Sequence, residues 1–218
     1  MIRGIGLIQT IQQLIPQALI PLFIVITYLG SVWVILPGLV FLYWLWDADR
    51  TAFVGSVVLT GFALTLTLKN LFALPRPPAS LHLMYAAGYG FPSGHSVDAT
   101  VTYGSLAMVV RAGKRWQRSV AASLLIGLVA LSRVVLGVHY PIDVIVGIAL
   151  GLGTLIVVSY VFDRNVLYIL ISAMVVAVLG IVVTHGDLES LVLFGGVGSA
   201  LLGWVWKERQ AERGHTDV

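Results

Sequence analysis

Apolar residues run in long stretches along this chain, and short clusters of polar and charged residues interrupt them. A helix that spans a bilayer needs about 20 mostly apolar residues, and several of these stretches approach that length. The stretches that predict spans are 30–46, 52–68, 96–110, 120–131, 141–162, 166–183 and 188–206. The pattern therefore predicts an all-α protein, a polytopic transmembrane helical bundle with about six or seven spans.

The two ends of the chain have a different pattern. Residues 4–28 mix apolar residues with glutamines, and Pro16 and Pro21 interrupt any continuous helix. We interpret this segment as an interfacial helix followed by a broken segment, although the same residues are compatible with a short first span. The tail, residues 207–218, is polar, and we expect it to be frayed.

Composition supports a membrane protein. Hydrophobic residues make up 58% of the chain and charged residues 11%, whereas globular domains are about 45–50% apolar. The chain has no cysteine, which excludes disulfides and cysteine-ligated metals. Because no repeat, soluble domain or linker interrupts the pattern, we expect one integral membrane domain over residues 1–218. The expected partners are the bilayer and a membrane-borne substrate, with no nucleic acid, and the oligomeric state stays open.

Positive charges are distributed unequally between the two sides of the predicted bundle. Nine of the 13 Lys and Arg residues fall on one side if residues 30–46 are the first crossing. These nine are Arg50, Arg111, Lys114, Arg115, Arg118, Arg164, Lys207, Arg209 and Arg213. Since Lys and Arg mark cytoplasmic loops, the opposite side, which carries the polar motifs described next, is predicted to be extracytoplasmic.

The stretch from Ser132 to Asp143 concentrates polar chemistry between two apolar runs. Pro141 suits the first position of a helix, which puts Asp143 in its first turn and His139 just before it. Asp143 can then accept a hydrogen bond from one imidazole nitrogen of His139 and leave the other free as a nucleophile. Arg133 could hold an anion in front of that nitrogen. Alternatively, the stretch is a membrane-interface turn in which Arg133 and Asp143 simply pair.

The loop from Lys69 to His95 contributes two further clusters. Lys69 is a flexible point charge, and Arg76 offers a planar fork that matches phosphate oxygens. Lys69 alone is equally typical of a lysine that snorkels at the end of a span. Ser93 and Gly94 precede an apolar run, so they predict a helix N-terminus, which binds anions through free N–H groups. His95 in that first turn could donate a proton to a leaving group, or serve only as a cap.

Taken together, these clusters indicate phosphoryl transfer. That reaction needs positive charge around the phosphoryl oxygens, an in-line nucleophile and a proton for the leaving oxygen. A metal site built from the two histidines and the carboxylate is the alternative. The neighbouring cations argue against it, because they would repel a divalent ion, so we expect neither a metal nor another cofactor.

The three motifs resemble the signature of the PAP2 superfamily, the type 2 phosphatidic acid phosphatases and their relatives. They are Lys69-x6-Arg76-Pro77, Pro92-Ser93-Gly94-His95 and Ser132-Arg133-x5-His139-x3-Asp143. The signature covers residues 69–143, and the spans from residue 30 to 162 resemble the family's helical core. The chain departs from the family in its short, proline-broken N-terminal segment and in two extra C-terminal spans within 166–206.

The resemblance implies a role for each motif residue. His139 would attack phosphorus to form a phosphohistidine, Asp143 would orient it, and His95 would protonate the leaving group and later activate water. The phosphate would be bound by Lys69, Arg76, Ser93, Gly94 and Arg133, without a metal.

The expected substrate is a lipid phosphate or pyrophosphate, of the polyprenyl pyrophosphate, phosphatidic acid or phosphatidylglycerol phosphate type. The alternative function is a phosphotransferase of the same fold that passes the phosphate to an alcohol. A haloperoxidase is disfavoured because those relatives are soluble.

Overall fold

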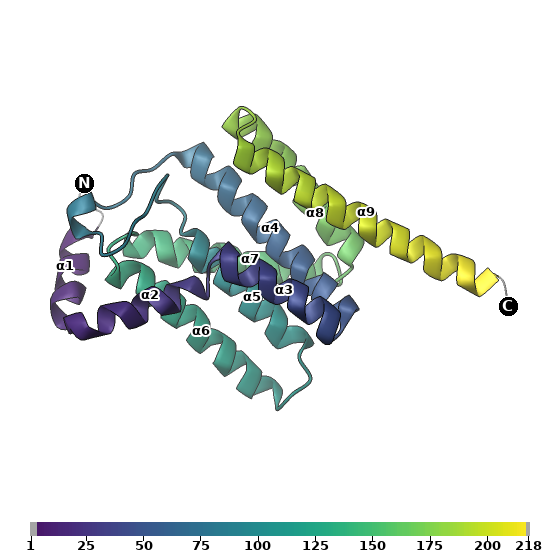
Figure 1. The fold of residues 1–218 in the computed structure, drawn as a ribbon, viewed down its shortest axis with the longest axis horizontal. Helices are drawn as coiled ribbons and strands as arrows, with labels where there is room; N and C mark the ends of the chain where they lie inside the picture. Colours follow the sequence, from purple (N-terminus) through teal and green to yellow (C-terminus); the bar gives the residue numbers. More distant parts are fainter. Residues whose placement is uncertain (1–3, 217–218) are drawn as a thin grey trace.

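The structure, a computed structural model, describes residues 4–216, and within that range every regular element is a helix (Figure 1). This confirms the all-α prediction. The α-helices are α1 (Ile5–Leu14), α2 (Ile20–Tyr28), α3 (Val32–Leu45), α4 (Ala48–Phe72), α5 (Gly94–Val109), α6 (Arg115–Val135), α7 (Pro141–Tyr160), α8 (Val166–Thr184) and α9 (Leu188–Thr216). Two short 3₁₀ helices, η1 (Gln17–Leu19) and η2 (Ala79–Leu81), lie in the connections.

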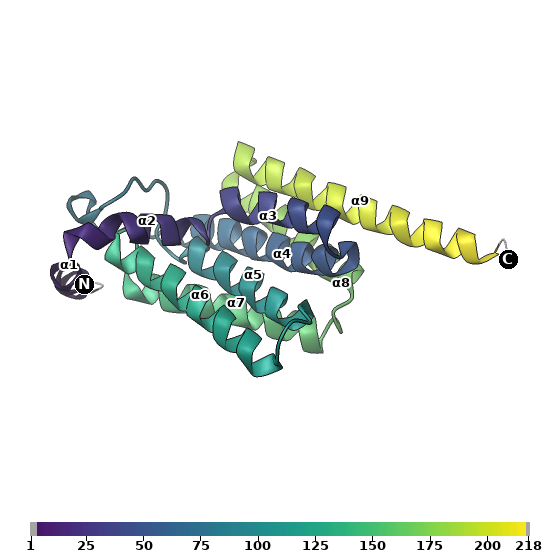
Figure 2. The same ribbon diagram turned by 60° about the horizontal axis from the view of Figure 1, so that its bottom comes forward.

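Each predicted span is a helix, and the long helices lie side by side in a bundle (Figure 2). Among the described residues, five helices are long and apolar enough to cross a membrane, namely α4, α6, α7, α8 and α9. The count rises to six if α1 and the following segment, which contains η1 and α2, form one broken span. These two segments are bent by 97° relative to each other. The helix α3 is apolar but shorter, at 14 residues, whereas α5 has 16 residues and does not count as apolar by the same measure.

The helix α5 lies in the middle of the bundle and packs against α4, α6 and α7. Glycines on the neighbouring helices allow this close packing. A Cβ atom added at Gly151 of α7 would lie 2.5 Å from the Thr100 side chain, and one added at Gly147 would lie 2.7 Å from the Ser93 carbonyl oxygen. The start of α5 is therefore held against α7, and this contact joins the second sequence motif to the third.

The N-terminal segment folds over one end of this bundle. The helix α1 turns sharply into α2, which packs against α6, and α3 follows against α4 (Figures 1 and 2). The hydroxyl of Tyr103 on α5 donates to the carbonyl of Leu29 at 2.8 Å, in the break between α2 and α3. Such a bond satisfies a backbone group that the helix break leaves without its helical partner.

The expectation of a frayed C-terminal tail is wrong as far as the structure describes the chain. The helix α9 continues without a break to Thr216. Residues 207–213 are strong helix formers, and side-chain contacts support the first turn beyond the apolar run. The indole N–H of Trp204 donates to Glu208, four residues later, at 2.8 Å, and Lys207 pairs with Asp49 of α4.

Candidate active site

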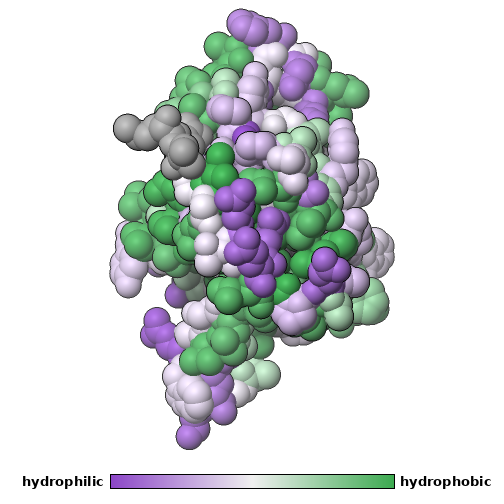
Figure 3. Space-filling model, turned by 90° about the vertical axis from the view of Figure 1, so that its left-hand side faces the viewer, coloured by the Kyte–Doolittle hydropathy of each residue, from purple (hydrophilic) through white to green (hydrophobic). Residues whose placement is uncertain are grey.

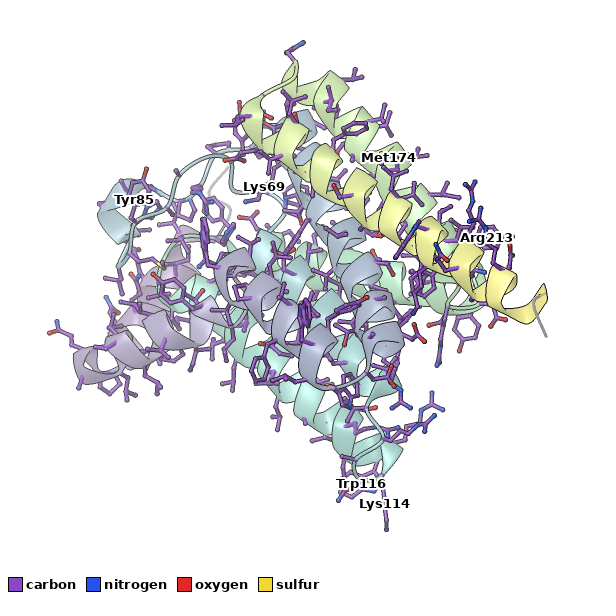
Figure 4. All side chains as sticks on the ribbon, turned by 45° about the vertical axis from the view of Figure 1, so that its right-hand side comes forward. Lys69, Tyr85, Lys114, Trp116, Met174 and Arg213 are labelled. Carbon is purple, nitrogen blue, oxygen red and sulfur yellow. The ribbon has the colours of Figure 1, made fainter. Side chains whose placement is uncertain are left out.

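The three sequence motifs meet at one end of the bundle, because helices that alternate in direction bring the end of α4, the start of α5, the end of α6 and the start of α7 together. Figure 4 shows Lys69 near the end of α4 on the same side as Tyr85 of the long loop, with Lys114 and Trp116 at the opposite end. In Figure 3, which faces the loop end, hydrophilic residues lie near the centre with hydrophobic ones on both sides, and further hydrophilic residues lie toward the upper and lower margins. We call this region the loop end.

The turn between α6 and α7 buries His139, whose side chain is only 1% exposed. The backbone reverses at Gly137, which has φ of +70° and so a conformation that favours glycine. A Cβ atom there would lie 2.0 Å from the carbonyl oxygen of Leu81. The amide of Leu83 in turn donates to the carbonyl of Leu136 at 3.0 Å. The long loop is thus fastened directly onto the turn that carries His139.

The two ring nitrogens of His139 have different neighbours. Nε2 lies 3.0 Å from Nη1 of Arg76. Because a guanidinium can only donate, Nε2 accepts this bond through its lone pair, and the proton of the neutral ring is on Nδ1. The lone pair of His139 therefore points toward the cationic group, which is the position that a phosphoryl group would need for attack.

The carboxylate of Asp143 faces the other nitrogen. Its Oδ2 atom lies 3.7 Å from Nδ1 of His139, which is an electrostatic contact but longer than a hydrogen bond. The same oxygen accepts from the backbone N–H of Tyr140 at 2.9 Å, so Asp143 also caps the start of α7. The carbonyl of Asp143 accepts from the amide of Ser93 at 3.0 Å, which ties α7 to the start of α5.

Arg76 is held in a fixed orientation by backbone carbonyls. Its Nη1 donates to Val138 at 2.9 Å, its Nη2 to Ala87 at 2.8 Å, and its Nε to Ala87 and Gly88, each at 3.1 Å. The guanidinium therefore links the far part of the long loop to the turn containing His139. A charge fixed in this way needs little reorganisation when negative charge develops beside it.

Arg133 lies in the last turn of α6 and is only 4% exposed. Its Nη1 donates to the hydroxyl of Thr27 on α2 at 2.7 Å and lies 3.8 Å from the sulfur of Met84. Its Nε is buried and has no hydrogen-bond partner among the described residues. A buried cation with an unused donor suits an anionic ligand, because leaving that donor unpaired costs free energy.

Lys69 and the start of α5 complete the cluster. Lys69 lies inside the last turn of α4, and a Cβ atom added at Gly94 would come within 3.8 Å of its ammonium nitrogen. Ser93 is the N-cap of α5, as predicted, but its hydroxyl accepts from Ser96 rather than from a backbone amide of the helix. His95 follows in the first turn. The first and second motifs are thus adjacent.

Burial and the surrounding charges determine the protonation of His139. Its pKa is lowered well below its usual range, first by burial and then by the positive charges of Arg133, Arg76 and Lys69. Both causes favour the neutral form of the imidazole ring, in which one ring nitrogen keeps its lone pair. Within residues 4–216, no three His, Asp or Glu side chains come together as metal ligands would.

Two polar residues outside the motifs support this site, and the sequence reasoning missed both. Thr27 is fully buried and accepts the hydrogen bond of Arg133. Gln12 on α1 donates to the carbonyl oxygens of Leu81 and Val135, at 2.9 and 3.0 Å, and so joins the long loop to the end of α6. In the sequence, each of these two residues appears only as a polar residue within an apolar segment. That pattern does not show which distant residue the side chain contacts.

An apolar groove of about 530 Å³ lies between α4, α7 and α8. Its lining includes Val146, one turn after Asp143 on α7, and Leu64, a little more than one turn before Lys69 on α4. Further lining residues continue along α7 and reach Phe162 just beyond its end, and α8 contributes Ser172 and Val176. The groove is the size of a typical ligand pocket and begins near the loop end.

Comparisons with known proteins agree on one family. The model of the PAP2 superfamily matches residues 50–167. The chain is 31% identical over 120 residues to sphingosine-1-phosphate phosphatase 1 from Rattus norvegicus. That match covers 49% of this chain and 27% of the rat protein, so the chain spans little more than a quarter of that relative's length.

Two comparisons with Bacillus subtilis proteins extend further. Phosphatidylglycerophosphatase B of strain 168 is 31% identical over 140 residues, covering 58% of this chain and 67% of that protein. The crystal structure of a transmembrane PAP2 type phosphatidylglycerolphosphate phosphatase superimposes with a TM-score of 0.67 at 25% identity. This alignment covers 73% of the present chain and 84% of the crystallised one, so the similarity includes most of the helical bundle.

Proposed function

The chain belongs to the PAP2 superfamily, and on that premise we propose that it is a multi-pass membrane phosphatase that hydrolyses lipid phosphates or pyrophosphates. The observation that carries the proposal is the lone pair of His139 Nε2, which faces Arg76 within a cluster of three buried or half-buried cations. The names of the relatives support a phosphorylated lipid as substrate, and the apolar groove beside the site supports a substrate with a long hydrocarbon chain.

In the proposed first step, Nε2 of His139 attacks phosphorus. The P–N bond forms as the bond from phosphorus to the leaving oxygen breaks, and His95 donates the proton that this oxygen needs. Burial and then Arg133 lower the pKa of His95, so we propose that His95 takes up this proton from water when the negatively charged phosphate binds beside it. The carboxylate of Asp143 keeps Nδ1 protonated and stabilises the positive ring. Arg76 gives up its contact with Nε2 at this stage, and its guanidinium binds the phosphoryl oxygens instead.

In the second step, water attacks the phosphohistidine. His95, now neutral, takes a proton from the water, the P–N bond breaks, and inorganic phosphate leaves. Lys69, Arg76 and Arg133 balance the charge on the phosphoryl oxygens in both steps, together with Ser93 and the amide of Gly94 at the start of α5. We propose that these groups supply the electrostatic stabilisation that a metal ion provides in other phosphatases.

The test is phosphate release by the purified protein from a panel of lipids, in the presence of EDTA. The panel contains a polyprenyl pyrophosphate, phosphatidic acid and phosphatidylglycerol phosphate, each with and without a free alcohol. We expect release of inorganic phosphate from at least one lipid, insensitive to EDTA and inhibited by orthovanadate, which resembles the transferring phosphoryl group. Transfer to the alcohol without hydrolysis would instead indicate a phosphotransferase, and loss of activity in EDTA that one metal restores would contradict the proposed mechanism.

We further propose that the loop end faces the extracytoplasmic side. Nine of the 13 cations lie away from it, and moving such a residue across the bilayer is costly, by roughly 2.5–3.5 kcal/mol on insertion scales. Because the chain has no cysteine, Ser80→Cys and Ala112→Cys provide single exposed thiols in the long loop and in the turn between α5 and α6. In intact cells, an impermeant maleimide should label position 80 and not position 112, and the reverse pattern would overturn the assignment.

A further inference from the structure

A second pocket lies at the end of the bundle opposite the loop end. It is a cavity of about 400 Å³ between α5, α6 and α7, and three arginines contribute to its lining, Arg115, Arg118 and Arg164. Two of them belong to the first turn of α6, and the third follows the end of α7. We call this cavity the arginine pocket. None of its lining residues belongs to the motifs at the loop end.

The arginines of the pocket have no acidic partner among the residues that the structure describes. Within the described part of the chain, no carboxylate lies within 4.0 Å of Arg115, Arg118 or Arg164. The Nε of Arg118 is buried and makes no hydrogen bond to any described residue. Two other cations at this end do have acidic partners, since Arg50 binds Asp47 and Lys207 binds Asp49. Three neighbouring like charges without a counter-charge provide a site for an anion.

The inner wall of the pocket is apolar. It includes Leu152 and Leu155 of α7 and Ile126 of α6, and it extends to Gly104 of α5. A Cβ atom at Gly104 would lie 2.3 Å from the side chain of Leu155, so the missing side chain of this glycine leaves room for the leucine. Ser119 and Ser123 of α6 also line the pocket and carry hydroxyl groups.

We propose that the arginine pocket binds the phosphate headgroup of an anionic membrane phospholipid, at a site separate from the catalytic one. The arginines and serines would bind the phosphate oxygens, and the first part of the acyl chains would lie against Leu152, Leu155 and Ile126. A small inorganic anion would leave that apolar wall uncovered, and a neutral lipid would leave the arginines unneutralised. Basic pockets between membrane helices are a common form of headgroup site.

The bound lipid would also stabilise the helices that carry the catalytic motifs. It would neutralise the repulsion between Arg164, beyond the end of α7, and the arginines at the start of α6, and so hold the two helices together at this end. The same two helices carry Arg133, His139 and Asp143 at the loop end. A ligand that binds only the folded protein raises its stability, so the lipid should raise the thermal unfolding midpoint.

The experiment measures which lipids remain bound to the purified full-length protein. The protein is equilibrated with equal amounts of phosphatidylglycerol and phosphatidylcholine in detergent, with orthovanadate present to occupy the catalytic site, and retained lipids are quantified by mass spectrometry. We expect wild type to retain phosphatidylglycerol several-fold over phosphatidylcholine. The double variant Arg118→Gln/Arg164→Gln should lose this preference. The charge-matched control Arg111→Gln/Arg209→Gln, at exposed arginines outside the pocket, should keep it.

A second variant covers the case in which the double variant fails to fold. Ser119→Glu puts a carboxylate into the pocket one helical turn from Arg115, a pairing that is compatible with the helix. It should abolish the preference for phosphatidylglycerol, whereas Ser119→Gln should not. Equal preference in wild type and Ser119→Glu would overturn the proposal. So would a rise in the unfolding midpoint with inorganic phosphate alone that equals the rise with phosphatidylglycerol, since the ligand would then be a free anion.

Discussion

The two ends of the helical bundle both gather arginines, but they hold them differently. At the loop end, Arg133 is buried and bonded to Thr27, and Arg76 donates to three backbone carbonyls and to His139. At the opposite end, Arg115, Arg118 and Arg164 have no acidic partner among the described residues and line a pocket. Fixed, partly desolvated charges suit a transition state, whereas more exposed charges at the rim of a pocket suit binding of a headgroup.

The two ends of the bundle also differ in the elements that cover them. Elements distant in sequence close over the loop end, namely α1, α2 and the loop that contains η2. The opposite end is formed largely by short turns between consecutive helices, such as residues 110–114 and 161–165. Positive charge alone therefore does not distinguish a reaction site from a binding site. The distinction lies in the burial of the charges and in a neutral histidine next to them.

Replacing His139 with Ala is expected to have the largest effect, because it removes the proposed nucleophile. Phosphate release should fall by about 10³-fold or more. The same assay on Arg118→Gln/Arg164→Gln should show little change, since those residues lie at the other end of the molecule. If the two variants lost phosphate release to a comparable extent, the proposed difference in function between the loop end and the opposite end would be wrong.

The next largest effect is expected from Asp143→Asn. The amide oxygen of Asn can still accept from the N–H of Tyr140, so the start of α7 and the unfolding midpoint should be preserved. The negative charge facing Nδ1 of His139 is lost, and the rate should fall by about 10²-fold or more, as it does when a histidine loses its orienting carboxylate. An active Asp143→Asn protein would show that the 3.7 Å contact is not needed for catalysis.

A smaller effect is expected at Thr27, which acts through Arg133. Hydrogen bonds to charged groups are worth roughly 1.5–3 kcal/mol, so Thr27→Val should lower kcat/KM by about tenfold or more, mainly through KM. Thr27→Ser keeps the hydroxyl and should restore most of the activity. Equal effects of Ser and Val would mean that Thr27 contributes packing alone.

The smallest effect is a shift in pH dependence. Burial and then Arg133 lower the pKa of His139 below its usual 6.5, so the neutral nucleophile should persist as the pH falls through that value. In Arg133→Gln the largest charge contribution is gone, the pKa rises, and the acidic limb of kcat/KM should move to higher pH. The phosphate of the substrate titrates near pH 6 itself, so both enzymes are compared on one substrate. An unshifted limb, or one shifted to lower pH, would contradict this explanation.

The motif residues could be identified from the sequence because their signals are local. The proline, serine and glycine before an apolar run predict the start of α5, and Pro141 predicts the start of α7, with Asp143 in its first turn. The ends of helices were less predictable. Lys69 and Arg133 lie inside the last turns of α4 and α6, because backbone hydrogen bonding continues after the apolar pattern stops.

The supporting contacts of the site could not be predicted, because they depend on how distant helices pack. Thr27 and Arg133 are 106 positions apart, and Gln12 and Val135 are 123 apart. Nothing in the local sequence of α1 or α2 specifies those partners. The arginine pocket is similar in this respect, since the charges of Arg115 and Arg118 were visible but their convergence with Arg164 follows from the packing of α6 against α7.

The central proposal, that His139 is the nucleophile at the loop end, is tested most directly by trapping the intermediate. Wild-type protein is mixed with a lipid carrying labelled phosphate, denatured in alkali after a few milliseconds, and digested for mass spectrometry under conditions that preserve phosphohistidine. We expect the label on the peptide that contains His139, and none on protein with His139→Ala. Label on another residue, or rapid turnover by wild type without any labelled protein, would contradict the proposal.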